Sequence, residues 1–144
     1  AAILRVKFKH LDIWTARRQE NAALYDRLFA ANGAPVKTPA RAASMTRHVV
    51  NQYVILAPRR DELRAHLAEQ GIGTEVYYPL PLHRQACFAG LGYGEGAFPV
   101  SERVARESLA LPVYPELTED DLRYVAEQVA GFYAKSGHSA EKNP

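Results

Sequence analysis

The fold is decided by one stretch of the chain, VVNQYVILAPRRDELRAHLAEQGIGTEVYYP, which occupies residues 49–79. Its first eight residues are rich in β-branched and aromatic side chains, which predicts a strand that Pro58 ends. A helix is expected from about residue 60 to residue 70, because leucines stand one turn apart and Gly71 follows as a helix stop. Residues 74–78 are expected to form a second strand. The stretch therefore predicts a β-α-β unit.

A long helix is expected before this unit, over residues 1–33. Its apolar residues recur at steps of three and four and gather on one face; they are Leu4, Phe8, Leu11, Trp14, Ala22, Tyr25 and Phe29. Gly33 and Pro35 are the residue types that end a helix. No Ser, Thr, Asp or Asn precedes the pattern as a cap, which indicates a chain that begins inside a helix of a longer protein, or just before one.

After the β-α-β unit, residues 79–83 are expected to be extended, because a proline disfavours the helical region for the residue before it. A short helix over residues 83–89 is expected next. A longer helix should follow over residues 100–109, with Ser101 as an available cap. Residues 111–115 contain two prolines and fit a short edge strand.

The last helix is expected to begin after Thr118, which can cap it. Asp121 takes the place of the acid in a capping box, three residues later. The buried stripe of this helix is expected to be Leu122, Val125, Val129 and Phe132. Residues 136–144 show no periodicity and are expected to be disordered.

These elements predict an α+β fold in the form of an α/β two-layer domain over residues 1–135. The domain would combine a long N-terminal linker helix, residues 1–33, with an α/β core, residues 48–135. In that core a small, mostly antiparallel sheet would contain the β-α-β unit, and helices would pack on one face.

Composition narrows the classes of protein and partner. The chain has 144 residues, of which 47% are hydrophobic and 24% charged, so one domain can build a core without disulfides or metal. Its net charge is only +2 and its basic residues alternate with acids, which argues against a nucleic-acid partner. No apolar run approaches the ~20 residues of a membrane span. Cys87 is the single cysteine, which excludes a disulfide framework and fits the reducing cytoplasm.

The lysines are poorly suited to covalent catalysis. A lysine that forms a Schiff base must be desolvated so that its pKa is lowered. None of the five stands in an apolar context: Lys7, Lys9, Lys37, Lys135 and Lys142. No glycine-rich phosphate motif opens a helix either. We therefore expect neither a catalytic lysine nor cofactor-binding residues in this chain.

Two further groups of residues have simpler explanations than chemistry. His83 and Cys87 stand one turn apart and could share a metal ion, but no second ligand pair is near, so no metal site is expected. A capping or surface histidine beside a buried cysteine fits better. Acidic residues at positions 61–62 and 116–121 stand at helix starts, where capping explains them.

The pair Tyr77-Tyr78 is the strongest candidate for ligand binding. Neighbouring residues at a strand end point in opposite directions, so one ring can pack inward while the other presents its hydroxyl. The prolines that follow stiffen the loop, and rigid tyrosines suit recognition of a polar ligand. Packing of both rings in the core or at a sheet edge explains the same residues.

Seven motifs occur in the order typical of one family, and they cover about residues 1–134. They are AAILRVKFKHLD at 1–12, HVVNQYVI at 48–55, RDELRAHL at 60–67 with GIGTEVYYP at 71–79 and PLH at 81–83, FPVSER at 98–103, LALP at 109–112, YPELT at 114–118, and FY at 132–133. In these motifs the chain resembles the C-terminal small domain of the DegT/StrS-type sugar aminotransferases.

The resemblance implies a fold-type I enzyme that depends on pyridoxal phosphate. Such an enzyme moves an amino group, usually from glutamate, to a keto-sugar nucleotide, with the cofactor as electron sink. The resemblance also implies a homodimer and a missing N-terminal large domain that holds the catalytic lysine and the cofactor site. The chain alone is therefore expected to be inactive and not to bind the cofactor.

The resemblance further implies which residues bind substrate: Tyr77, Tyr78 and His83. Tyr78 matches the second residue of a pair, His-Tyr in many members, that contacts the sugar nucleotide in the neighbouring subunit's active site. Tyr77 replaces the histidine and so removes a group that can be cationic near neutral pH. His83 matches the family's Pro-Leu-His motif, and Asn51 stands where many members have histidine.

Two other interpretations stay open. One is a free-standing α/β module that binds a metabolite or forms a dimer without catalysis. The other is part of a sugar dehydratase that uses the same cofactor. The sequence upstream of Ala1 in the parent gene would separate these interpretations.

Overall fold

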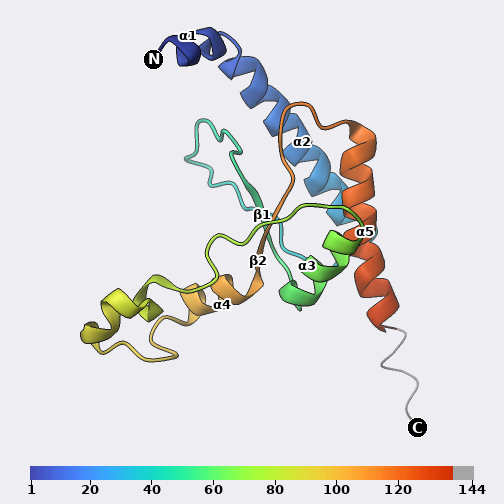
Figure 1. The fold of residues 1–144 in the computed structure, drawn as a ribbon. Helices are drawn as coiled ribbons and strands as arrows, with labels where there is room; N and C mark the ends of the chain where they lie inside the picture. The colour runs from blue at the N-terminus through green and yellow to red at the C-terminus, as the bar shows by residue number, and fades with distance from the viewer. Residues whose placement is uncertain (138–144) are drawn as a thin grey trace.

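The structure, a computed structural model, describes residues 1–137. Its elements follow the order α1 (Ala2–Phe8), α2 (Leu11–Asn32), β1 (Tyr53–Leu56), α3 (Arg60–Glu69), the 3₁₀ helices η1 (Leu82–Arg84) and η2 (Ala86–Leu91), α4 (Pro99–Glu107), β2 (Ser108–Leu111) and α5 (Glu119–Gly137) (Figure 1). This mixture of helices with a small antiparallel sheet confirms the predicted α+β class. Most of the stretch predicted to be disordered, 136–144, lies outside the described residues, and residues 136 and 137 belong to α5.

The sheet has β2 inserted between the two strands of the predicted β-α-β unit. β1 pairs antiparallel with β2, from Tyr53 opposite Leu111 to Leu56 opposite Ser108. The second predicted strand is reduced to one antiparallel bridge between Glu75 and Ala110, with N–H···O distances of 3.2 and 2.8 Å. β2 therefore lies between β1 and the segment around Glu75, and the three run as a split β-α-β arrangement.

The prediction of an edge strand over residues 111–115 is wrong in position. β2 ends at Leu111, because Pro112 and Pro115 have no N–H to donate to a neighbouring strand. Residues 108–111 are all buried, so they lack the alternation that marks a half-exposed strand. The preceding helix correspondingly ends at Glu107 rather than at residue 109.

The helix predicted to be continuous over residues 1–33 is interrupted at Lys9 and His10. All ten of the first residues are exposed, and Figure 1 shows α1 turned away from the axis of α2. Within residues 1–137, α1 has no core to pack against, so its apolar side chains do not hold it in line with α2.

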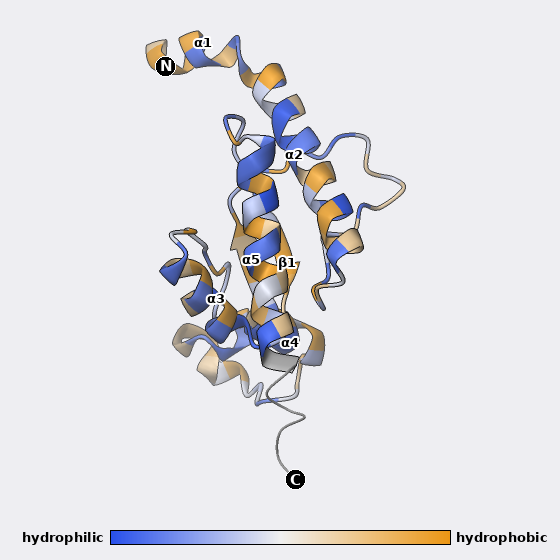
Figure 2. Ribbon diagram, turned by 90° about the vertical axis from the view of Figure 1, so that its right-hand side faces the viewer, coloured by the Kyte–Doolittle hydropathy of each residue, from blue (hydrophilic) through white to orange (hydrophobic). Residues whose placement is uncertain are grey.

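The core lies between the sheet and the long helices. Figure 2 shows α5 in front of β1, with α2 beside it. Tyr25 and Phe29 of α2 pack with Tyr53 and Ile55 of β1 in one buried cluster. The predicted stripe of α5 is confirmed for Leu122, Val125 and Val129, which are buried, and Phe132 packs partly buried against the same cluster.

The predicted caps give one success and one failure. Thr118 and Asp121 form the capping box: the Asp121 N–H donates to Thr118 Oγ1 at 3.2 Å, and the Thr118 N–H donates to Asp121 Oδ2 at 2.9 Å. Ser101 does not cap α4. That helix begins after Phe98 with Pro99 in its first turn, a position where the missing N–H of proline costs nothing.

Candidate functional site

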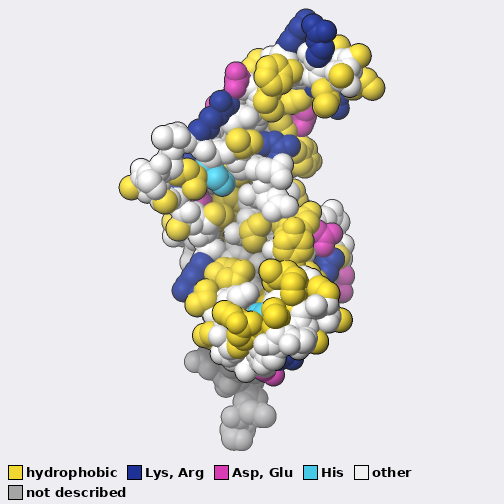
Figure 3. Space-filling model, turned by 90° about the vertical axis from the view of Figure 1, so that its left-hand side faces the viewer, with side chains coloured by type: hydrophobic (Ala, Val, Ile, Leu, Met, Phe, Trp, Pro, Cys, Tyr) yellow, Lys and Arg dark blue, Asp and Glu magenta, His cyan; other side chains and the backbone are white. Residues whose placement is uncertain are grey.

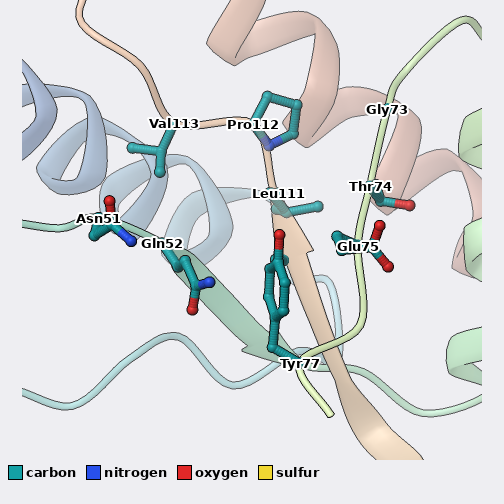
Figure 4. A pocket seen from close by; sticks show the side chains of 10 residues that line it. Asn51, Gln52, Gly73, Thr74, Glu75, Tyr77, Leu111, Pro112 and Val113 are labelled. Carbon is teal, nitrogen blue, oxygen red and sulfur yellow. The ribbon is translucent and has the colours of Figure 1, made fainter. Parts of the chain in front are cut away.

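A cavity of about 310 Å³, which we call the central cavity, opens at the end of the sheet, where three separate segments meet (Figure 4). One wall is the chain just before β1, at Asn51 and Gln52. The second is the segment from Gly73 to Tyr77, and the third is the end of β2 with the residues that follow it, up to Val113. The split sheet creates this site, because β2 brings its own end between the other two segments.

The polar groups of the central cavity are mostly neutral. Figure 4 shows the Gln52 amide on the side of the Tyr77 ring, whereas the Glu75 carboxylate points away from Gln52. Glu75 Oε1 accepts the N–H of Val76 at 2.9 Å and lies 3.7 Å from the Arg64 guanidinium. The carboxylate is thus engaged outside the group formed by Asn51, Gln52 and Tyr77.

The two tyrosines differ in position. Tyr77 lines the central cavity with 41% of its surface exposed, whereas Tyr78 is 75% exposed. Their rings meet edge-on, with centroids 6.3 Å apart and planes at 78°. The pairing with β2 stops at Glu75, so both tyrosines lie beyond the strand whose alternation was expected to separate them.

His83 lies in a different part of the molecule, the lobe formed by η1, η2 and the start of α4. Its Nε2 is 3.1 Å from Oε1 of Glu102, and both side chains are only 8% exposed. The Phe98 ring covers the imidazole, with centroids 4.8 Å apart. The expectation of a surface histidine beside a buried cysteine is wrong on both counts, because the His83 side chain is buried and Cys87 is exposed.

Glu102 organises this lobe, although no motif in the sequence singled it out. Its two oxygens each accept the N–H of Gly96 at 2.9 Å, and one also accepts the N–H of Phe98 at 3.4 Å. These bonds, led by the Gly96 N–H and supported by His83, hold the pKa of the Glu102 carboxyl below its ordinary value against the opposing effect of burial. No local spacing reveals the pair, because 19 positions separate His83 from Glu102.

A second cavity of about 310 Å³ lies beside His83 and is almost entirely apolar, lined by Leu82, Phe88, Leu91, Tyr93 and Phe98. Figure 3 shows the hydrophobic side chains gathered over this lobe. The structure therefore places Tyr77 at the central cavity with the exposed Tyr78 in contact with its ring, and it places His83 beside a separate apolar cavity.

The described residues do not fit pyridoxal phosphate. All four described lysines are exposed, namely Lys7, Lys9, Lys37 and Lys135, and Lys142 lies outside the described residues. The start of α4 is occupied by the Glu102 carboxylate and the first turn of α5 carries three acids, so neither helix start favours a phosphate. Within residues 1–137, no group of three or more His, Cys, Asp or Glu side chains is placed to hold a metal ion. No helix in that range is long and apolar enough to cross a membrane.

Comparison with known proteins identifies similar chains. The model of the DegT/DnrJ/EryC1/StrS aminotransferase family matches residues 1–130. The chain is 55% identical to a "Pleiotropic regulatory protein" of Geobacillus stearothermophilus, over 92% of this chain and 36% of that protein. It is 41% identical to the dTDP-3-amino-3,4,6-trideoxy-alpha-D-glucose transaminase of Streptomyces venezuelae, over 81% of this chain and 30% of that protein.

The fold is similar to solved aminotransferase structures. S. venezuelae DesV, solved in complex with a ketimine intermediate, matches 91% of this chain with a TM-score of 0.83 and 36% identity, and 35% of the DesV chain is covered. A family aminotransferase from Brucella abortus matches with a TM-score of 0.80 and 32% identity, covering 91% of this chain and 34% of that one. The chain thus spans about a third of the length of the curated relatives it matches.

Proposed function

Because the chain belongs to the DegT/DnrJ/EryC1/StrS aminotransferase family, we propose that it is the C-terminal small domain of a pyridoxal-phosphate-dependent enzyme. That enzyme transfers an amino group, from glutamate in the simplest case, to a keto-sugar nucleotide. The observation that carries this proposal is the similarity to the S. venezuelae transaminase and to DesV, which extends over nearly all of this chain but about a third of theirs.

The proposal divides the enzyme's work between two domains. Since the described residues do not fit the cofactor, a large domain outside this chain would supply the catalytic lysine and the cofactor site. When bound there, the cofactor supplies the electron sink for amino-group transfer. The 144-residue chain alone would have no transaminase activity.

The residues of this chain would contribute to substrate binding in a homodimer. Tyr78 is the more exposed of the two tyrosines, and an exposed phenol can reach a sugar nucleotide held by a neighbouring subunit. Tyr77 would line the same substrate's site from the central cavity. His83 would act indirectly, because its imidazole is paired with Glu102 and covered by Phe98.

The test is an assay of the longer protein encoded by the gene that contains this sequence. Supplied with pyridoxal phosphate, glutamate and a 3- or 4-keto sugar linked to dTDP or UDP, it should produce the amino sugar nucleotide, detected by mass spectrometry. Loss of water from the sugar without gain of nitrogen would instead identify a dehydratase. Failure of both reactions, together with metabolite binding by the isolated chain, would favour a free-standing binding module.

A further inference from the structure

The central cavity holds polar side chains that the fold does not use. Within residues 1–137, the side chains of Asn51, Gln52 and Tyr77 make no hydrogen bond to the protein, although all three line the cavity. Some other amides of the chain do donate to backbone carbonyls. Gln19 donates to His48 at 2.7 Å and Asn21 donates to Tyr114 at 2.8 Å. Asn51 and Gln52 therefore have free donors and acceptors in a cavity whose volume is at the lower end of the range of about 300–1,000 Å³ typical of small-molecule sites.

The backbone that carries these amides is held in place. Arg18 Nη1 donates to the carbonyl of Val113 at 2.8 Å and approaches that of Asn51 at 3.4 Å. One guanidinium thus links two walls of the cavity. The residue after Gln52 is buried Tyr53, whose hydroxyl donates to Asp26 at 2.7 Å. A fixed backbone lowers the entropy that the site would lose when a ligand binds.

The chemistry of the lining selects the kind of ligand. Among residues 1–137, no Lys, Arg or His side chain lines the central cavity, and the one carboxylate that does, Glu75, points away from Gln52. A diphosphate would find no cation in this cavity to pair with. Amide and phenol groups both donate and accept hydrogen bonds, and so do the hydroxyl groups of a sugar ring.

We infer that Asn51 and Gln52, together with Tyr77, bind hydroxyl groups of the sugar ring, and that the diphosphate of the nucleotide lies outside this cavity. The inference rests on the proposed function for the identity of the ligand. It adds two specificity-determining residues and states which part of the ligand they contact.

The test is NMR titration of the ¹⁵N-labelled 144-residue chain with three probes at millimolar concentration: dTDP-glucose, dTDP and methyl glucoside. dTDP-glucose and methyl glucoside should shift the side-chain NH₂ signals of Asn51 and Gln52 and the amide signal of Gly73. dTDP alone should leave them unchanged. Equal shifts with dTDP and dTDP-glucose would overturn the inference by placing the nucleotide in the cavity, and no shift with any probe would overturn it as well.

A matched pair of variants identifies the contact. Gln52→Ala should weaken binding of dTDP-glucose by about 2- to 10-fold, the usual effect of losing one neutral hydrogen bond. Gln70→Ala, at an exposed glutamine outside the cavity, should leave the Kd unchanged. Equal affinities of the two variants would overturn the role of Gln52. The proposed function is judged separately, by whether the longer protein aminates a keto-sugar nucleotide, so either claim can fail without the other.

Discussion

The carboxylate of Glu102 lies 3.1 Å from Nε2 of His83, and this pair joins η1 to the first turn of α4. The same carboxylate accepts the N–H of Gly96 through both oxygens. One side chain therefore fixes three segments of a lobe that follows the tyrosine pair along the chain. Hydrogen exchange of the Gly96 amide reports directly on this arrangement.

Glu102→Gln should loosen the lobe. The substitution keeps the size of the side chain, but it replaces one carboxylate oxygen with an NH₂ group, a donor that faces the Gly96 N–H. We therefore expect the Gly96 amide to exchange about tenfold faster. Glu116→Gln is the control, because Glu116 is exposed and lies outside the lobe. Unchanged protection of Gly96 in Glu102→Gln would contradict the role of this carboxylate.

The pH dependence of the exchange protection of the Gly96 amide follows from the direction in which the pKa of Glu102 is shifted. The pKa of Glu102 is lowered in the folded chain from its ordinary value of 4.5, so its stabilising effect is complete above that value. The effect is lost as the pH falls through the lower pKa of the folded state. Protection of Gly96 should therefore decline as the pH falls below 4.5 and through the lowered pKa of Glu102, and Glu102→Gln should abolish that component of the decline.

Thr118→Ala should destabilise the whole domain through α5. The substitution removes the hydroxyl that accepts the Asp121 N–H, and loss of an N-cap of this type costs about 1 kcal/mol. Urea denaturation measures the change in the free energy of unfolding. Thr46→Ala, in an exposed loop, serves as the control, and an equal effect of the two substitutions would rule out the capping box as the cause.

Local motifs were predictable from the sequence, whereas contacts between distant segments were not. The capping box of Thr118 and Asp121 spans three residues, and the buried stripe of α5 repeats with the period of a helix, so both could be found without tertiary information. β2 and the pair of His83 with Glu102 depend on partners far away in the sequence. The central cavity likewise forms only where Gln52, Tyr77 and Leu111 meet, which no spacing in the sequence indicates.

Tyr78→Phe in the longer protein should reduce use of the sugar nucleotide more than use of glutamate. The hydroxyl is proposed to contact only the sugar nucleotide, and losing one such bond costs about 0.5–1.5 kcal/mol. The two half-reactions can be followed separately by the absorbance of the cofactor. Tyr124→Phe, on α5, is the matched control. Equal losses in both half-reactions, or none in either, would indicate that Tyr78 only packs.

The isolated chain should self-associate through its N-terminal helix. Ile3, Leu4, Val6 and Phe8 of α1 are each at least 66% exposed, and neighbouring apolar side chains of this kind favour burial against another surface. Sedimentation over a range of concentrations should reveal a dimer that Phe8→Glu shifts toward monomer. Ala16→Glu, which adds the same charge at an exposed position of α2, should not. A compact monomer at every concentration would contradict the expectation.

The central claim is that this chain belongs to an aminotransferase whose cofactor lysine lies elsewhere in the protein. Its most direct test is incubation of the longer protein and of the 144-residue chain with pyridoxal phosphate, followed by dialysis, borohydride reduction and mapping of the modified peptide. We expect a cofactor adduct on a lysine of the longer protein outside residues 1–144, and no adduct on the chain alone. A dialysis-stable adduct on Lys37 or on any other lysine of this chain would contradict the claim.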